Sequence, residues 1–592
     1  GLSLALPTLI GLPTYLFGWR FSGVGVLWLY GLIGGVVLLG LFRRARHPIP
    51  NDTAQPPTPH SPFLIPHSQF LILLTFALLL AFRFYQARTL ALPAWVDSIH
   101  HTLLVRLFLE TGGVPATLHP YIDAPFYYHF GFHLNTALFA FFARLSPEHA
   151  VLIFGQFLNA FVSLAMYRLG MALWQDWRRA TLALILTGFV FQMPGYYLTW
   201  GRYTLLTGLG LMILAMAAAL EVVRAPKDRG RHHREAAARL GVYVAAVLLT
   251  HYYAAGLLAL FFFMLALEQV VFNEARPWQL WKHAGFRTLF LAGLGGFLLA
   301  SPWLWNVWTG GNQYFGVNVV APTASVDEAF FSGYLDYLWF LLGPYRSHVL
   351  ALTGLVALFL VGWRDHTRSF GLWTIAAAIL SLPWGVHLAP FRPDHGVIVA
   401  FLPAGILIAD AFVTPLDAPA RAWFRWLARG ALLVGLPALV IWGVRETREV
   451  INPVTILVNP AEVQALDWIA HNTPDDARFF INVTYWQAGS YRGVDGGWWI
   501  SPVTGRQTFL PPALYLLGKP EAILEISALG GRAAQFTGCT EDFLAFLREN
   551  ALTHVYLGPS QGSLRPEQLE GCDGLYVVYA DAGATIYQVD FK

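Results

Sequence analysis

The chain has 592 residues, of which 56% are hydrophobic and only 12% are charged. Soluble domains carry about 25% charged residues, so this composition excludes an ordinary soluble protein and predicts a multi-pass α-helical protein of the cell membrane. The net charge of +3 is too small and too dispersed for a nucleic-acid-binding protein. The only cysteines, Cys539 and Cys572, do not have the spacing of a structural zinc site.

Apolar runs that could cross about 30 Å of hydrocarbon recur along the first three quarters of the chain. They lie at 1–18, 22–42, 67–85, 149–172, 180–198, 204–223, 287–306, 347–363, 369–386, 396–413 and 428–444. The longer run at 239–271 predicts two short spans with "THYY" (250–253) at the turn. A shorter run, 131–146, either crosses or re-enters the membrane. We expect about thirteen crossings in total.

Basic residues in short loops predict the orientation of these spans, because such loops stay on the inner side of the membrane. They occur at 42–47, 224–234, 276–287, 363–368 and 421–429. The loop 87–130 is then outside, together with the turns that carry Arg202, His251 and Arg392. Polar and aromatic residues therefore gather on the outer face.

The composition changes after Arg445, which divides the chain into a membrane domain, 1–445, and an extracytoplasmic α/β domain, 446–592. Helix-then-strand patterns occur at "PAEVQALDWIAHNTPDDARFFINV" and "TEDFLAFLRENALTHVYLGP", and "GLYVVYADAGATIYQVDF" predicts a closing hairpin. In an oxidising compartment the two cysteines of this domain would form a disulfide. The alternative is a pair of buried, unbonded thiols.

The stretch "WVDSIHHTLLVRLFLETGG" (95–113) concentrates ionisable residues in the outer loop. Its apolar positions recur at helical spacing, which predicts an amphipathic helix lying on the outer surface. Asp97, His100, His101 and Arg106 would lie along the start and the polar face of this helix. Asp97 could deprotonate an incoming hydroxyl, or it could be the helix N-cap, and these two roles are compatible.

The stretch "HPYIDAPFYYHFGFH" (119–133) contains a second carboxylate, Asp123. His129 and His133 have i,i+4 spacing, so they could share a metal on one helix face or line a polar cavity. Tyr128 and its aromatic neighbours could stack on sugar rings or belong to the interfacial belt. No residue is assigned as a metal ligand.

Arg202 in "TWGRYT" and Arg392 in "APFRPDHG" are expected at outer helix ends. The planar donor fork of either arginine could hold a phosphate, or its side chain could extend to lipid headgroups. His395 lies close to Arg392 in the sequence. His251 lies at a turn, where a structural histidine is the alternative to a binding role.

The segment 485–512 is rich in Trp, Tyr, Gly and Arg. It could contact carbohydrate, cover the membrane site, or be a plain Gly-rich loop with buried tryptophans. GxSxG, Walker A and GxGxxG motifs are missing from a strand–helix context, which argues against an ATPase or a dinucleotide enzyme.

These residues resemble the GT-C superfamily of integral-membrane glycosyltransferases, over about 67–444. The similarity rests on an acidic outer loop after an early span ("WVDSIHH"), on "DAPFYYHFGFHLNTALFAFFARLSPEHAVLIFGQFLNAF", and on "YYLTWGRYT". The C-terminal α/β domain is also similar to that of bacterial members. The paired prolines of the superfamily's loop end are replaced here by Tyr128-His129.

The resemblance implies an enzyme of the cell envelope that transfers a sugar, with inversion, from a polyprenyl-phosphate donor to a glycan, lipid or protein acceptor. Asp97 matches the acid of the first loop, a base or metal-site ligand, and Asp123 is the second choice. Arg202 or Arg392 would hold the donor phosphate. The remaining candidates for substrate binding are His100, His101, Tyr128, His251 and His395. The superfamily varies in metal dependence, so a divalent cation such as Mg²⁺ or Mn²⁺ stays open as a cofactor.

A transporter and a ligase or polymerase of lipid-linked glycans are the alternative functions. Transporters place polar groups near the bilayer midplane and often contain repeats, whereas here the ionisable residues lie at one boundary and the sequence shows no repeat. A ligase or polymerase would also use outer-face Arg and His side chains.

Overall fold

The computed structural model describes most of the chain. The described residues are 1–20, 31, 35, 67–224, 230–272, 276–311, 320–322, 336–343, 345–381, 386–388, 393–417, 422–486, 489–559 and 562–590. Arg392 and nearly all of the run 22–42 lie outside them.

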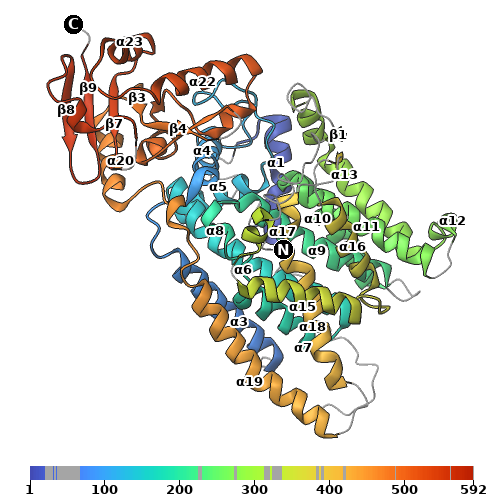
Figure 1. The fold of residues 1–592 in the computed structure, drawn as a ribbon. Helices are drawn as coiled ribbons and strands as arrows, with labels where there is room; N and C mark the ends of the chain where they lie inside the picture. The colour runs from blue at the N-terminus through green and yellow to red at the C-terminus, as the bar shows by residue number, and fades with distance from the viewer. Residues whose placement is uncertain are drawn as a thin grey trace.

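Helices make up almost all of the described chain before residue 448 (Figure 1). The first half contains α1 (Leu2–Phe17), α3 (His67–Ala87), α4 (Trp95–Thr111), α5 (Gly131–Ala143), α6 (Pro147–Trp174), α7 (Trp177–Ile185), η1 (Leu186–Val190), α8 (Tyr197–Trp200), α9 (Tyr203–Val223), α10 (Arg231–Thr250), α11 (Tyr252–Val271), α12 (Pro277–Leu280) and α13 (Ala284–Gly311). The second half contains α15 (Tyr345–Val361), α16 (Arg368–Leu380), α17 (Pro393–Ile398), α18 (Phe401–Asp417) and α19 (Ala422–Thr447), with strands β1 (Val320–Pro322) and β2 (Val386–Leu388) paired antiparallel.

Five described helices are long and apolar enough to cross a membrane, and a sixth span results if Asp336–Leu342 and Ser347–Val361 are one bent segment. The five are Gln69–Ala87, Pro147–Trp174, Tyr203–Val223, Tyr252–Val271 and Ala284–Gly310. The expected thirteen crossings are not reached in the described ranges, because several expected spans are shorter or broken. Run 180–198 changes from α7 to the π-helix η1 and leaves the helix at Phe191. Run 239–271 breaks at His251, as expected.

Helix α9 is the centre of the bundle, packed against α6, α10, α11 and α13. In α9, 89% of the apolar segment is buried, so this helix is surrounded by protein. In α13 only 22% of the apolar segment is buried, so most of its surface is left for lipid. Exposed tryptophans lie near both ends of α13: Trp278 and Trp281 before it, Trp305 and Trp308 at its end. The helix between them is about 30 Å long at 1.5 Å per residue, which matches the thickness of the hydrocarbon core of a bilayer.

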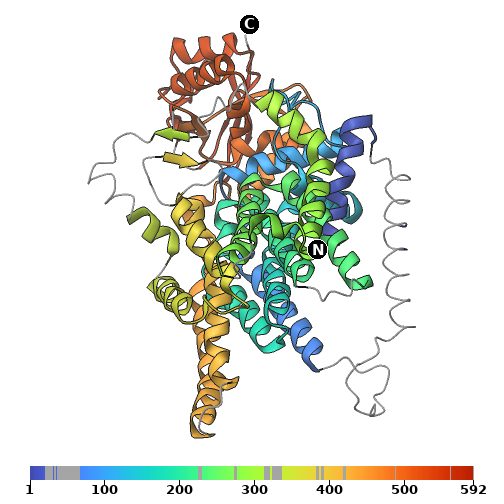
Figure 2. The same cartoon turned by 90° about the vertical axis from the view of Figure 1, so that its right-hand side faces the viewer.

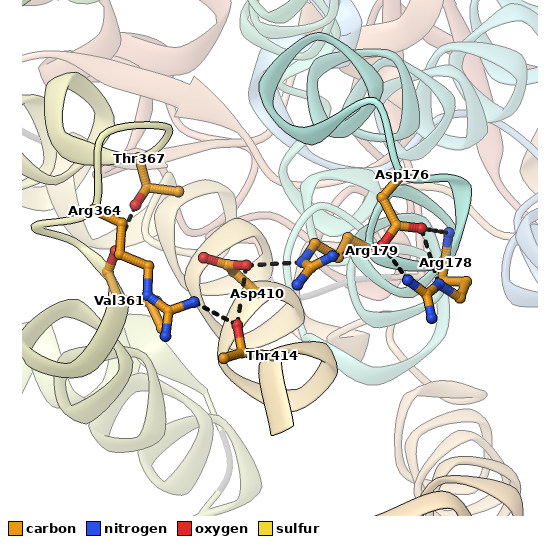
Figure 3. A network of polar contacts seen from close by, with 8 residues as sticks. All are labelled: Asp176, Arg178, Arg179, Val361, Arg364, Thr367, Asp410 and Thr414. Carbon is orange, nitrogen blue, oxygen red and sulfur yellow. Dashed lines mark hydrogen bonds and ion pairs between the residues drawn. The ribbon is translucent and has the colours of Figure 1, made fainter. Parts of the chain in front are cut away.

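Figure 3 shows a closed polar network that joins α7 and α18 at the end of the bundle away from the C-terminal sheet. Arg179 donates to Asp410 at 2.9 Å and to Asp176 at 2.5 Å. Asp176 also pairs with Arg178 at 3.0 Å. Arg364 donates to Thr414, whose hydroxyl lies 3.5 Å from Asp410. Each charge here has an opposite charge or a hydroxyl as its partner.

The C-terminal part is an α/β unit around a five-stranded sheet of order β6-β3-β7-β9-β8. The helices are α20 (Pro460–Asn472), α21 (Ile500–Thr504), α22 (Pro520–Ala533) and α23 (Glu541–Glu549), and the strands are β3 (Arg478–Ile481), β4 (Val483–Tyr485), β5 (Tyr491–Gly493), β6 (Gln507–Thr508), β7 (His554–Leu557), β8 (Leu575–Ala580) and β9 (Thr585–Val589). Both predicted helix–strand units and the β8–β9 hairpin are therefore confirmed. Cys539 and Cys572 form a disulfide, which confirms the predicted pairing.

This unit lies directly on α4 (Figures 1 and 2). Arg106 of α4 donates to the carbonyl of Pro502 at 2.8 Å and to that of Val503. The Tyr127 hydroxyl donates to the carbonyl of Leu517. The prediction that α4 lies on the outer surface was wrong: most of its side chains are buried, because α5 and α6 pack against it together with α21 of the C-terminal unit.

Candidate active site

The site begins at the first turn of α4. The N-cap of α4 is Ala94, and Asp97 is the third helical residue. The alternative prediction that Asp97 is the N-cap was therefore wrong. The Asp97 carboxylate forms no hydrogen bond or ion pair with any residue that the structure describes. Two residues earlier, Trp95 has a φ of 68°, a conformation that costs a non-glycine residue about 1–2 kcal/mol. Its ring lies under the guanidinium of Arg492, 5.1 Å from the ring centroid, so the C-terminal unit supports this turn.

A close contact at Gly201 brings the turn before α9 against the start of α4. A Cβ at Gly201, where φ is +64°, would lie 2.1 Å from Ser98 Oγ, so only glycine fits. The next residue, Arg202, is the N-cap of α9 and packs over the Trp200 ring at 4.8 Å. Like Asp97, its guanidinium pairs with no carboxylate in the described part of the chain.

Both of these charges influence Tyr128. Burial raises the pKa of its hydroxyl, the Asp97 carboxylate raises the pKa further, and Arg202 lowers it. Both charges therefore act on one hydroxyl.

Five histidines surround Tyr128 in a continuous group of rings, which we call the histidine cluster: His100, His101, His129, His133 and His251. Their centroids are 4.5 Å apart for His100–His101, 5.0 Å for His101–His133, and 4.8 Å for His129–His251. The Tyr128 ring lies 3.9 Å from His129 and 5.8 Å from His133, which links the two halves. Burial lowers the pKa of His100 and His101, with a further decrease at His101 from the other imidazoles.

Small residues and one backbone bond hold the cluster together. Gly131, at the start of α5, packs directly against Thr250. A Cβ at position 131 would lie only 2.1 Å from Thr250 Oγ1, so a larger residue does not fit there. The amide of Phe130 donates to the carbonyl of Leu249 at 3.0 Å, which sets His129 beside His251. A Cβ at Gly208 of α9 would lie 2.6 Å from the Cβ of His251, so α9 also approaches this turn closely.

His395 lies at the edge of the same site, and it acts electrostatically on His251, as Arg202 does. Its ring packs on Tyr253 at 4.6 Å. Asp123 is placed differently, because its side chain is 93% exposed and pairs with His119 at 3.0 Å. Of the two candidate carboxylates, only Asp97 faces the histidine cluster.

The described side chains do not fit a metal ion. Helix α5 starts at Gly131, so His129 and His133 do not share one helix face as the spacing suggested. Within the described ranges, no three His, Cys, Asp or Glu side chains converge closely enough to hold a metal.

Sequence reasoning missed two residues of the site, Tyr252 and Trp303. The Trp303 ring packs on Phe130 at 4.9 Å and on Phe126 at 5.6 Å, and the Tyr252 ring packs on His129 at 5.3 Å. Aromatic residues inside apolar runs carry no local signal that separates a site from a core. In segment 485–512, Trp498 and Trp499 are fully buried, which agrees with the alternative of a Gly-rich loop with buried tryptophans. Pro502 and Val503 of the same segment contact α4.

Two cavities flank the bundle at other places. One of about 1330 Å³ is lined by α6, α9 and α10 and includes the pair Glu221–Arg239, 2.9 Å apart. The other, of about 450 Å³, is lined only by apolar residues of α11, α12 and α13 and their flanks. Neither includes Asp97 or Arg202.

Comparisons with known proteins identify the fold. A model of the "Family of unknown function (DUF6541)" matches residues 1–392, and no curated protein matches the chain. The arabinofuranosyltransferase AftD from Mycobacteria superposes with a TM-score of 0.54 at 16% identity, over 88% of this chain and 40% of AftD. The Archaeoglobus fulgidus oligosaccharyltransferase, in its complex with Zn and sulfate, superposes with a TM-score of 0.51 at 13% identity, over 87% and 73%. Both are GT-C superfamily glycosyltransferases, so this chain has a GT-C fold.

Proposed function

The chain belongs to DUF6541, a family of unknown function, and we propose that it is a membrane glycosyltransferase that moves a sugar from a polyprenyl-phosphate donor to an acceptor at the outer face of the membrane. The observation that carries the proposal is the contact of Gly201 with Ser98, which brings the turn of Arg202 against the turn of Asp97 while neither charge has a described partner. Charges near hydrocarbon are costly to leave unpaired. A substrate that brings both a hydroxyl proton and a phosphate would satisfy them together.

Asp97 acts as the base in this proposal. It takes the proton of the acceptor hydroxyl as the oxygen attacks the anomeric carbon. The bond from that carbon to the phosphate oxygen breaks on the opposite side, and its electron pair leaves with the lipid phosphate, so the configuration inverts. A positioned base contributes roughly 10²–10⁴-fold.

Arg202 holds the departing phosphate. Its planar donor fork matches two phosphate oxygens, and donors aimed at developing charge stabilise the transition state. The Nδ1 atoms of His100 and His251 are buried without a partner among the described residues, so these two side chains would contribute hydrogen bonds to the same substrate. Arg392 and His395 would complete this side of the site.

The lipid tail would lie between α11 and α13. Both helices reach the site at one end, through Tyr252 and Trp303. Farther along, both line the apolar cavity of about 450 Å³. A tail whose phosphate lies near Arg202 would follow this side of the bundle into the hydrocarbon.

The C-terminal unit would be extracytoplasmic and would help to hold the acceptor. Its contacts with Arg106 and Trp95 place it over the first turn of α4, and its disulfide suits an oxidising compartment. The exposed Trp305 and Trp308, which follow Trp303 in α13, support a site near one interface of the membrane. The proposal uses no metal ion, since the described side chains do not form a site for Mg²⁺ or Mn²⁺.

The Asp97→Asn variant tests this function. In lipid nanodiscs supplied with a panel of polyprenyl-phosphate sugars, the wild type should release lipid phosphate, and the variant should lose roughly 10²–10⁴-fold in turnover. The thermal unfolding midpoint should stay unchanged, because Asp97 bonds to no described residue. Glu110→Gln, at the exposed end of the same helix, is the matched control and should retain activity.

Two results would refute the proposal. If Asp97→Asn turns over like the wild type, Asp97 is not the base. If the wild type releases no lipid phosphate from any donor but moves the intact lipid or solute across the membrane, the transporter alternative replaces the glycosyltransferase.

A further inference from the structure

Two histidines of the cluster share a single hydrogen bond between α4 and α5. His101 Nδ1 lies 3.0 Å from His133 Nε2, and the two residues are only 1% and 0% exposed. One nitrogen of this pair must donate and the other must accept. The choice determines which nitrogen of His101 carries a proton toward the site.

The surroundings of His133 decide this choice. Its second nitrogen, Nδ1, is buried without an aligned partner among the described residues, and the polar group beside it is the backbone carbonyl of His129, one turn earlier. A carbonyl oxygen only accepts, so a bare lone pair on Nδ1 would be repelled there and a proton on Nδ1 is favoured. Neutral His133 then has its lone pair on Nε2 and accepts from Nδ1–H of His101.

This order of protons leaves a lone pair on Nε2 of His101. The groups that act on His101 are His100 on its own helix, His133 on α5, His129 and His251, and no carboxylate is among them. Burial among imidazoles lowers the pKa of His101, so this ring is neutral at neutral pH. The hydrogen bond to His133 uses Nδ1 of His101, and no hydrogen bond joins its Nε2 to a described residue.

We propose that His133 is a positioning residue that holds His101 in one tautomer, so that His101 Nε2 accepts a hydrogen bond from a sugar hydroxyl at the site. This inference rests on the proposed function and divides the site in two. Arg202 takes the phosphate, while Asp97 and His101 present acceptors to hydroxyl groups. His101 therefore contributes to the selection of a hydroxyl-bearing substrate and does not bind the phosphate.

The test is ¹⁵N NMR of histidine-labelled protein in nanodiscs, with the His101 signal identified by its loss in His101→Gln. We expect a protonated Nδ1 and a bare Nε2 at His101. In His133→Phe, which cannot accept, this pattern should be lost and KM for the hydroxyl-bearing substrate should rise roughly tenfold with kcat nearly unchanged. His133→Gln, whose amide oxygen can accept, should restore both.

The outcomes separate this inference from the proposed function. A proton on Nε2 of wild-type His101 overturns it, and so does an unchanged KM in a folded His133→Phe protein. If His133→Phe does not fold, the wild-type and His133→Gln spectra still decide. If no sugar is transferred at all, the proposed function fails while the spectra continue to report the tautomer.

Discussion

The two polar regions of the membrane domain are built on opposite plans. In the network of Figure 3, Arg179 bridges Asp176 and Asp410 and both carboxylates are nearly buried. At the candidate active site, Asp97 and Arg202 act on the same tyrosine but pair with nothing in the described chain. The first region has no charge left for a ligand, whereas the second has one of each sign.

This difference separates structural from functional charge. Breaking a buried pair leaves an uncompensated charge and destabilises a protein strongly, so the network holds α7 to α18. Charges that the protein itself leaves unpaired contribute little to stability and are available to a substrate. The two regions should therefore respond in opposite ways to substitution.

The largest effect is expected at Arg179. Arg179→Met leaves Asp410 without its ion pair and should lower the free energy of unfolding by about 3–5 kcal/mol, measured as a lower unfolding midpoint in detergent. Activity per folded molecule should stay the same. The control is Arg178→Met, which removes a more exposed partner of Asp176 and should cost no more than about 1 kcal/mol. Equal stability of the two variants would contradict the structural role of the network.

Arg202 should show the reverse behaviour. Arg202→Met should reduce sugar transfer roughly 100-fold, because a donor to the developing phosphate charge is lost. Its unfolding midpoint should change little, since only the contact with the Trp200 ring is removed. Arg202→Lys keeps the charge without the donor fork, so its rate of sugar transfer should lie between those of the wild type and Arg202→Met. Arg88→Met, which breaks the exposed pair with Glu449, serves as the control, and an equal loss of activity there would remove Arg202 from the mechanism.

A smaller effect is expected from a third arrangement, the buried carboxylate Asp495 of the C-terminal unit. Burial, with the Glu462 carboxylate beside it, raises the pKa of Asp495 to about 8 from the ordinary aspartate value of about 3.9. Between these values the folded state binds more protons than the unfolded state, so stability should decrease as pH rises, by at most about 1.4 kcal/mol per pH unit for this group. Below pH 4 the contribution should be constant.

Unfolding followed by fluorescence from pH 4 to 8 checks this slope. Asp495→Asn cannot ionise, so its slope should be smaller than that of the wild type. A wild-type stability that is flat or rises over this range would show that Asp495 is ionised in the folded protein.

Local patterns accounted for much of the fold. Helix-then-strand patterning identified α20 and α23 with the strands that follow them, and the closing alternation identified the β8–β9 hairpin. The break at His251 was also predicted, because polar and aromatic residues interrupt an apolar run there. The surface position of α4 was wrong, since periodicity shows that a polar face exists but not what covers it.

The candidate site was predicted as a set of residues but not as an arrangement. Asp97 and Arg202 stood out because ionisable residues are rare in an apolar chain, and that signal needs no structure. Asp123 had the same signal and the same loop, yet it faces solvent and pairs with His119. Trp303 and Tyr252 had no signal, because an aromatic residue in a span is ordinary.

The sequence by itself determined that the chain enters a membrane, where its helices break, that a C-terminal α/β unit follows, and which charged residues are candidates. Only the tertiary structure decided that α4 is buried under that unit, that Asp97 and Arg202 meet at Tyr128, and that five histidines form one cluster. The physical reason is range. Helix, strand and turn preferences act between near neighbours in the chain, whereas the site depends on contacts such as Gly201 with Ser98 and Arg106 with Pro502, which no local pattern encodes.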